Sequence, residues 1–151
     1  WNVVFIDGKP YNLDLTWDDP IGEGVTQNKR YAYFNITDEE ILKTHTFSDA
    51  SACCTATDSN YFVKLGRQFD GYNAETKTAL SNMFGGHKSG DKLDVRFSSE
   101  DAYQRAIDGL LKKEEIYRLL SIADAGKGGF STTQINYIAD DTHCVIEFIL
   151  V

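Results

Sequence analysis

The chain begins with two short runs of β-forming residues that flank the dipeptide Asp7-Gly8. An Asp-Gly pair between two such runs is the pattern of a two-residue hairpin turn. We therefore predict an antiparallel hairpin around this turn. A two-residue turn also fixes the register of the strands, and the expected pairs are Ile6 with Lys9, Val4 with Tyr11, and Trp1 with Asp14.

Because side chains alternate between the two faces of a strand, the hairpin gathers polar and apolar groups on one face. The residues expected to share that face are Asn12, Asp14 and Thr16 with Trp1, Val3 and Phe5. An acidic side chain between a tryptophan and a threonine is costly to desolvate unless a partner stabilises it. Asp14 is thus the hairpin residue that most needs a partner.

The middle of the chain has weaker patterns. A polar loop over residues 18–29 leads to an aromatic strand candidate at residues 31–34. Thr37 followed by Glu40 fits a capping box, which predicts a short helix through about Lys43. Residues 44–59 are small and polar with no period, and they form the best domain boundary.

Beyond this boundary the pattern alternates between strands and helices. The expected strands are residues 61–65 continuing at 68–69, residues 92–97, and residues 134–139 paired with 144–151 around Asp140-Asp141. The expected helices are residues 74–84, ended by Gly85-Gly86, and residues 100–123 with a bend near 112–114. The order β-α-β-α-β-β predicts an α+β fold in which helices pack on a small antiparallel sheet.

Composition narrows the function classes. The 151 residues carry a net charge of −8, which argues against binding to a nucleic acid backbone. No apolar run approaches 18 residues, so we expect no membrane span. The sequence predicts no cofactor. Aromatic residues make up 13% of the chain, and together with the aliphatic residues they are enough for a folded core.

The run WNVVFIDGKPYNLDLTWDDP resembles the stretch of bacterial transglutaminase-like proteins that follows their catalytic histidine. These proteins belong to the papain-like cysteine protease superfamily. In that family a His-x-Trp motif opens one strand, and an aspartate followed two residues later by threonine lies on the next. Trp1, Asp14 and Thr16 match the tryptophan, the aspartate and the threonine. The resemblance covers about the first fifty residues and continues through residues 33–40.

This resemblance implies that Asp14 is the orienting acid of a Cys-His-Asp triad, with Trp1 and Thr16 supporting it. In such a triad a thiolate attacks an amide, an imidazole takes the thiol proton, and a carboxylate orients the imidazole. The histidine and the cysteine of the motif would lie upstream of Trp1, so we expect a fragment that is inactive alone and whose partner is the N-terminal portion of the same protein. Residues 1–50 would be the end of the transglutaminase-like core, and residues 60–151 an accessory α+β domain.

The resemblance also implies a protein or peptide amide as the substrate of the parent enzyme, and an extracellular or cell-surface location. The alternative is a non-catalytic structural or adhesion module of a cell-surface protein that uses the same fold. The two hypotheses differ in the residues before Trp1. A histidine two positions upstream of it and a cysteine further upstream favour catalysis, whereas substitutions there favour the structural role.

Other chemistry-bearing residues support weaker hypotheses. Cys53 and Cys54 with His45 as a base have the wrong order for the family, so we interpret the cysteines as buried thiols, with one bridge to Cys144 left open. Asp14 is then expected to have no partner within the chain. The adjacent cysteines, with His143 and Cys144, lack the ligand spacing of a metal site, and we predict none.

Two further stretches have features of a binding surface. The glycine-rich stretch 126–129 lacks the Gly-Lys-Ser/Thr ending of a phosphate-binding loop and is interpreted as a connector. Tyr31, Tyr33 and Phe34 offer a stacking surface for a carbohydrate or peptide, although core packing is the commoner role of such residues.

Overall fold

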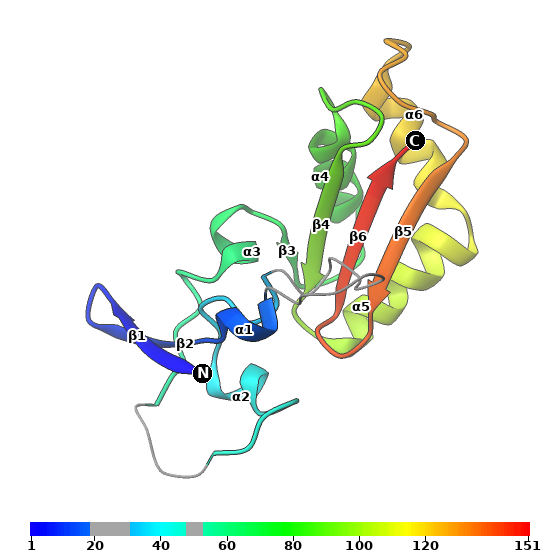
Figure 1. Ribbon diagram of the computed structural model, residues 1–151. Helices are drawn as coiled ribbons and strands as arrows, with labels where there is room; N and C mark the ends of the chain where they lie inside the picture. Colours follow the sequence, from blue (N-terminus) through cyan, green and yellow to red (C-terminus); the bar gives the residue numbers. More distant parts are fainter. Residues whose placement is uncertain (19–30, 48–52) are drawn as a thin grey trace. The chain divides into compact units, whose positions relative to one another are not determined.

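The chain is described from a computed structural model, which places residues 1–18, 31–47 and 53–151. These residues form two compact units, Trp1–Arg67 and Gln68–Val151 (Figure 1). The first contains a two-stranded antiparallel sheet, and the second contains a four-stranded mixed sheet with packed helices. The predicted α+β class is confirmed. The predicted loop at residues 18–29 lies almost wholly outside the described residues.

The first unit opens with the predicted hairpin. Strands β1 (Asn2–Ile6) and β2 (Lys9–Leu13) pair antiparallel around Asp7-Gly8, and Ile6 lies opposite Lys9 as predicted. Asp7 and Gly8 have φ values of 50° and 78°, the left-handed values that a type I′ turn requires. The second predicted pair, Val4 with Tyr11, is also present, but the pairing ends at Asn2 with Leu13 and does not include the predicted pair of Trp1 with Asp14. The turn chemistry was therefore sufficient to predict the register but not the length of the ladder.

The alternation of faces ends earlier than we predicted. A short helix, α1 (Leu15–Asp18), begins directly after Asp14, so Thr16 lies on a helix and is exposed. Thr16 therefore does not continue the strand face that carries Trp1 and Asn12. On that face the Trp1 indole Nε1 donates to the Asn12 side-chain oxygen at 3.0 Å.

Two predicted strands are wrong. Residues 31–34 form turns, and only Ile36 makes an isolated antiparallel bridge, to Asn12. Residues 61–64 form helix α3 (Tyr61–Lys64), because the Asn60 side chain caps its first turn by accepting from the Phe62 amide. Gly66 follows the helix with a φ of 65°. These capping signals outweighed the β propensity of the aromatic residues.

The remaining helix of the first unit follows its capping signal. Helix α2 (Asp38–Ile41) begins after Thr37, whose hydroxyl accepts from the Glu40 amide while the Glu40 carboxylate accepts from the Thr37 amide. The predicted capping box is therefore confirmed. The helix ends two residues before Lys43, and its chain continues through a turn to His45. This short helix and turn bring His45 toward the hairpin.

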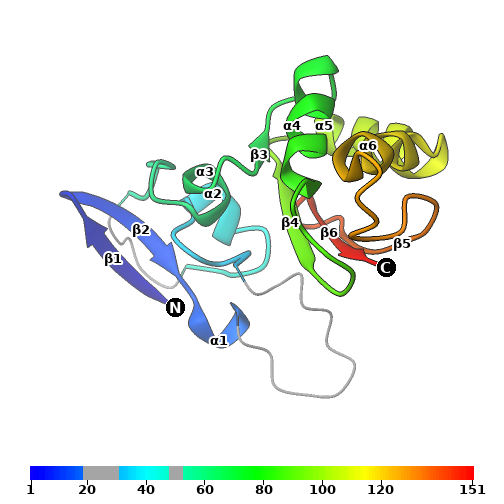
Figure 2. The ribbon, with the colours of Figure 1, turned by 90° about the horizontal axis from the view of Figure 1, so that it is seen from above.

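The second unit has the predicted helices on one face of a sheet (Figure 2). Its strands are β3 (Gln68–Phe69), β4 (Lys92–Phe97), β5 (Ile135–Asp140) and β6 (Val145–Leu150), in the order β3-β4-β6-β5. Pairing is antiparallel except between β3 and β4, which are parallel. The predicted antiparallel sheet is therefore mixed at one edge, because β3 joins β4 after a crossover through α4.

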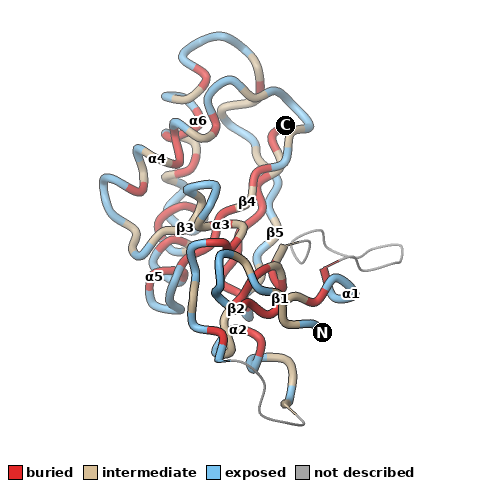
Figure 3. The backbone as a smooth tube through the Cα atoms, turned by 90° about the vertical axis from the view of Figure 1, so that its left-hand side faces the viewer, coloured by how far each residue is buried: buried red, intermediate tan, exposed pale blue. Residues whose placement is uncertain are grey.

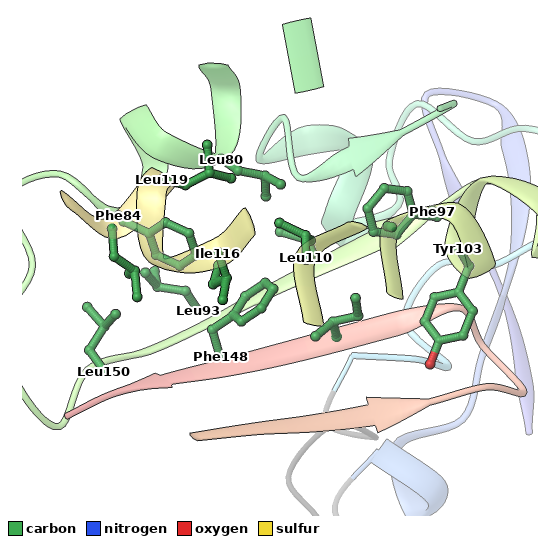
Figure 4. Packing of buried hydrophobic residues seen from close by; sticks show 14 of the residues in the cluster. Leu80, Phe84, Leu93, Phe97, Tyr103, Leu110, Ile116, Leu119, Phe148 and Leu150 are labelled. Carbon is green, nitrogen blue, oxygen red and sulfur yellow. The ribbon is translucent and has the colours of Figure 1, made fainter. Parts of the chain in front are cut away.

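Each helix of this unit turns its apolar side toward the sheet. They are α4 (Ala74–Phe84), α5 (Glu100–Ala106), the π-helix η2 (Ile107–Lys112) and α6 (Glu115–Asp124). Alternate β4 and β6 side chains, such as Leu93 and Phe148, meet Leu110 and Ile116 in one buried cluster (Figure 4). The inner strands are the more buried ones, whereas β5 is largely intermediate or exposed (Figure 3). The predicted bend corresponds to η2 and to Glu114, whose φ is 58°.

Candidate functional site

Asp14 lies where strand β2 ends and helix α1 begins, and the backbone on both sides fixes its carboxylate. Oδ1 accepts from the Thr16 amide at 3.0 Å and from the Trp17 amide at 3.1 Å. These are the contacts of a helix N-cap, which satisfies two amides that the first turn leaves without partners. The residue is 6% exposed. Asp14 therefore presents a buried carboxylate with one oxygen fully committed to the backbone.

The second oxygen of Asp14 has a partner that the sequence analysis did not predict. The His45 Nε2 atom lies 3.2 Å from Asp14 Oδ2, and both side chains are nearly buried. The expectation that Asp14 has no partner within the chain is therefore wrong. It failed because His45 lies 31 residues away in the chain, and a contact at that separation has no local sequence signal.

The imidazole of His45 is itself held from several sides. Its Nδ1 atom lies 2.8 Å from the Thr44 hydroxyl oxygen. Three aromatic rings surround it, with centroid distances of 5.1 Å for Trp1, 4.6 Å for Trp17 and 5.3 Å for Tyr33. None of these rings is parallel to the imidazole, so they pack mainly by edge and tilted contacts. We call Trp1, Trp17 and Tyr33 the aromatic box.

Trp1 connects this box to a second network of hydrogen bonds. Its indole donates to Asn12, and the Asn12 amide group donates to Asp38 Oδ1 at 2.8 Å. The other Asp38 oxygen accepts from the Cys54 amide at 3.0 Å. These contacts tie the hairpin to the start of α2 and to the segment around Cys54. Thr16, in contrast, supports Asp14 only through its backbone amide.

A second carboxylate, Asp18, lies one helical turn after Asp14. Its Oδ1 accepts from the Tyr33 amide at 2.8 Å, and Oδ2 has no hydrogen-bond partner among the residues that the structure describes. Burial, opposed in part by the Tyr33 amide and assisted by the Asp14 charge, raises the pKa of Asp18 to about 7. Asp18 was not among the predicted site residues, although its place four residues after Asp14 was a usable signal.

Among the described residues, the cysteines do not have the surroundings of a catalytic nucleophile. Cys54 is buried, and burial raises the pKa of its thiol to about 11, opposite to the change that activates a cysteine. None of the three cysteines forms a disulfide bond, and Cys144 lies in the second unit. The predicted burial holds for Cys54 and Cys144, but Cys53 is exposed. The open possibility of a bridge to Cys144 is therefore not realised.

The weaker candidates have structural partners. Within the described parts of the chain, no three histidine, cysteine or acidic residues are arranged to hold a metal ion. His143, considered as a metal ligand, lies 2.8 Å from Asp140 Oδ2 through Nδ1. In the glycine-rich connector, the amides of Gly128 and Gly129 donate to the Asp124 carboxylate, which lowers the pKa of Asp124. The amides that would bind a phosphate are therefore already occupied.

The aromatic surface proposed at residues 31–34 is not a single exposed platform. Tyr33 is fully buried, and it contacts His45 and Trp17. Tyr31 stacks on Tyr61 with a centroid distance of 3.9 Å and an interplanar angle of 10°. Packing within the first unit therefore accounts for both tyrosines.

Comparisons with known proteins add no family to this picture. The chain matches no protein-family model, and a search of curated proteins found no match either. Among the helices of the described residues, none is long and apolar enough to cross a membrane.

Proposed function

We propose that the chain is the carboxylate-bearing part of a transglutaminase-like cysteine acyltransferase or protease that acts on protein or peptide amides. Asp14 is its orienting acid, and the histidine and cysteine of the triad belong to a segment upstream of Trp1. The chain alone is then inactive, because it lacks both the nucleophile and the base. The parent enzyme would act outside the cell or at its surface, in line with the family that the hairpin resembles.

The observation that carries this proposal is the geometry of the Asp14 carboxylate. It is buried, and two backbone amides hold Oδ1 in place. The amino nitrogen of Trp1 lies 3.7 Å from Oδ2, so a segment joined to Trp1 would start beside this oxygen. In the family motif the histidine lies two residues before this tryptophan. A fixed carboxylate beside that strand is what the orientation of an imidazole requires.

Replacement of Asp14 by asparagine in the full-length protein separates the catalytic role from the capping role. The Asn oxygen still accepts from the Thr16 and Trp17 amides, but the side chain no longer carries the charge that fixes the imidazole tautomer. We expect Asp14→Asn to slow labelling by a thiol-directed active-site probe about 10²–10⁴-fold, by analogy with serine protease triads. The thermal midpoint should change by only a few degrees.

Asp38→Asn is the matched control, because Asp38 is also held by a backbone amide and a side chain of the first unit but lies in the Asn12 network. It should leave labelling unchanged. Normal labelling of the Asp14→Asn protein, or equal losses in both variants, would contradict the assignment of Asp14 to a triad.

The alternative proposal is a non-catalytic structural or adhesion module. It is favoured by one specific observation: the Asp14 contacts to α1 and to His45 are sufficient to explain its burial as a cap of the fold. Under this proposal no thiol in the full-length protein reacts with the active-site probe, and Asp14→Asn changes only stability. The labelling experiment therefore decides between the two functions.

A further inference from the structure

The second unit has a pocket at its surface, between helices α4 and α6. These helices lie side by side (Figure 2). They run in the same direction, because their contacts advance by four residues along both: Lys77 pairs with Glu115, and Ser81 bonds to Leu119. The pocket flanks this line of contacts and has a volume of about 450 Å³, within the range of small-molecule sites.

Short side chains on α4 leave the space for this pocket. Ala74, Thr78 and Ser81 lie on one stripe of the helix, since they recur every three or four residues. Ser81 is buried, and its hydroxyl donates to the Leu119 carbonyl at 3.1 Å. The packing of the two helices therefore fixes the floor of the pocket. The opposite wall comes from α6, whose lining residues include Ile122, one turn after the arginine at position 118.

The charge of the pocket is opposite to that of the whole chain, which carries a net charge of −8. Lys77 and Arg118 both line the pocket, and none of the described residues around it is acidic. Lys77 is compensated, because its Nζ atom lies 2.8 Å from Glu115 Oε2. The exposed Arg118 guanidinium forms no ion pair or hydrogen bond with any residue that the structure describes. One uncompensated positive charge therefore remains at the pocket.

The lining restricts the chemistry of a ligand. A guanidinium presents a planar fork of N–H donors that matches the two oxygens of a carboxylate. One uncompensated charge favours a monoanion, since the second charge of a phosphate dianion would have no counterpart. Leu119 and Ile122 supply apolar area beside Arg118, and Ile122 is 57% exposed. A hydrocarbon group next to the carboxylate would cover this exposed side chain.

The geometry points to a binding site for small amphipathic monocarboxylates between α4 and α6, in which Arg118 binds the carboxylate and Ile122 contacts the hydrocarbon part. Lys77 borders the site and is held by Glu115 and by the Tyr72 ring, whose centroid lies 4.7 Å from its Nζ atom. The site lies wholly within the second unit, so it does not depend on Asp14 or on the proposed function.

Titration of the ¹⁵N-labelled 151-residue chain with hexanoate tests the site. We expect shifts of the backbone amide signals to concentrate on residues 73–82 and 118–122 and to saturate with a Kd of about 1–10 mM, as for other ligands of this size. Hexylamine and 1-hexanol have the same hydrocarbon chain without the negative charge, and both should bind at least about 10-fold more weakly.

Three results of these titrations would overturn the proposal. The first is the absence of hexanoate-dependent shifts in these two segments. The second is equal binding of hexanoate and 1-hexanol, because the charge would then not be recognised. The third is that inorganic phosphate reproduces the shifts at the same concentrations, which would show a general anion site with no role for the hydrocarbon part.

Substitutions at two exposed positions test the two halves of the site without disturbing the core. We expect Arg118→Gln to raise the Kd for hexanoate at least about 10-fold and to abolish the preference over 1-hexanol. Ile122→Ser should raise the Kd about 3-fold or more, because it removes apolar contact area.

Arg105→Gln is the matched control, because Arg105 is an exposed arginine of the same unit that pairs with Asp101 on α5. It should leave the Kd within about 2-fold of that of the natural chain, since exposed charges at a distance are screened. Unchanged affinity of the Arg118→Gln chain, or equal losses in the two arginine variants, would overturn the assignment of Arg118 to the carboxylate. Unchanged affinity of the Ile122→Ser chain would overturn the assignment of the hydrocarbon part.

Discussion

At the scale of the residue, the buried carboxyl group of Asp18 should make stability depend on pH. Its pKa is about 7 in the folded chain against 3.8 in the unfolded chain. Between these values the folded state binds the proton and the unfolded state does not, so the free energy of unfolding falls as pH rises from about 4 to about 7. The loss is complete about one pH unit above 7, where the folded carboxyl group has also ionised.

Asp18→Asn should remove this dependence, since the Asn oxygen still accepts from the Tyr33 amide and the side chain has no charge to desolvate. We expect the variant to be more stable than the natural chain by about 1–3 kcal/mol at pH 8, and equally stable near pH 4. Urea unfolding at the two pH values measures both differences. A variant that is less stable at pH 8 would show that the carboxylate is stabilised in the folded chain.

Single residues also show what the sequence could and could not predict about the site. That Asp14 needs a partner followed from the alternation of side chains along the hairpin strands. The identity of the partner could not be predicted, because the contact with His45 depends on the turn after α2, which has no periodic signal. The aromatic box was likewise not predicted, since Trp17 faces His45 only because α1 starts where an extended strand was expected.

At the scale of the element, the hairpin turn depends on the left-handed conformation of Gly8. Gly8 has a φ of 78°, and a Cβ atom added there would meet no heavy atom within 4 Å, so only backbone strain opposes a side chain. We expect Gly8→Ala to lower the free energy of unfolding of the first unit by about 1–2 kcal/mol. Asp7→Asn, which creates the sequence Asn-Gly, is the control and should change it by less than about 0.5 kcal/mol. Urea unfolding followed by tryptophan fluorescence measures both.

The π-helix η2 offers a test of packing in the second unit. A Cβ atom added at Gly109 would overlap the ring of Tyr72, so the ring or the helix must move. We expect Gly109→Ala to cost about 2–3 kcal/mol or more. Gly71→Ala is the control in the same unit, because its nearest atom lies at 3.9 Å and its φ is not left-handed. Chemical denaturation followed by circular dichroism compares the two.

The coupling of Gly109 to Tyr72 can be separated from a general intolerance of η2. In a Tyr72→Ala background the ring is absent, so the added cost of Gly109→Ala should fall markedly. An equal cost in both backgrounds would contradict the steric explanation. A π-helix at this point also explains why the sequence predicted a bend: the apolar stripe of residues 100–123 shifts where η2 inserts its wider turn.

Elements set by neighbouring residues were predicted well, whereas elements set by contacts distant in the sequence were not. The residues that determine the capping box, the end of α4 at Gly85-Gly86 and the β5–β6 hairpin all lie within a few positions of each other. The prediction for residues 61–64 was wrong although local signals were present. Their aromatic composition predicted a strand, whereas Asn60 and Gly66 are helix start and stop signals. In segments this short, capping residues outweigh β propensity.

At the scale of the whole molecule, the two units differ in the cores that the described residues supply. In the first unit a small cluster is formed by Ala32, Tyr33, Ile36 and Ile41. The second unit has a continuous core between its helices, α4 to α6, and the face of the sheet that they cover. Because stability grows with the apolar area that a unit buries, the second unit should be the more stable one.

We therefore expect the chain to unfold in two transitions. Both of its tryptophans, Trp1 and Trp17, lie in the first unit, so tryptophan fluorescence follows that unit alone. Far-ultraviolet circular dichroism follows both units, and most of its signal comes from the helices of the second. In urea the fluorescence midpoint should come at a lower concentration than the main circular dichroism midpoint.

One substitution in each unit tests this assignment. Ile36 and Leu110 are both fully buried, and truncation to alanine costs about 2–5 kcal/mol at such positions. Ile36→Ala should lower only the fluorescence midpoint, and Leu110→Ala only the circular dichroism midpoint. If either substitution moves both midpoints together, the units unfold as one, and the second unit then stabilises the Asp14–His45 pair as well as carrying its own core.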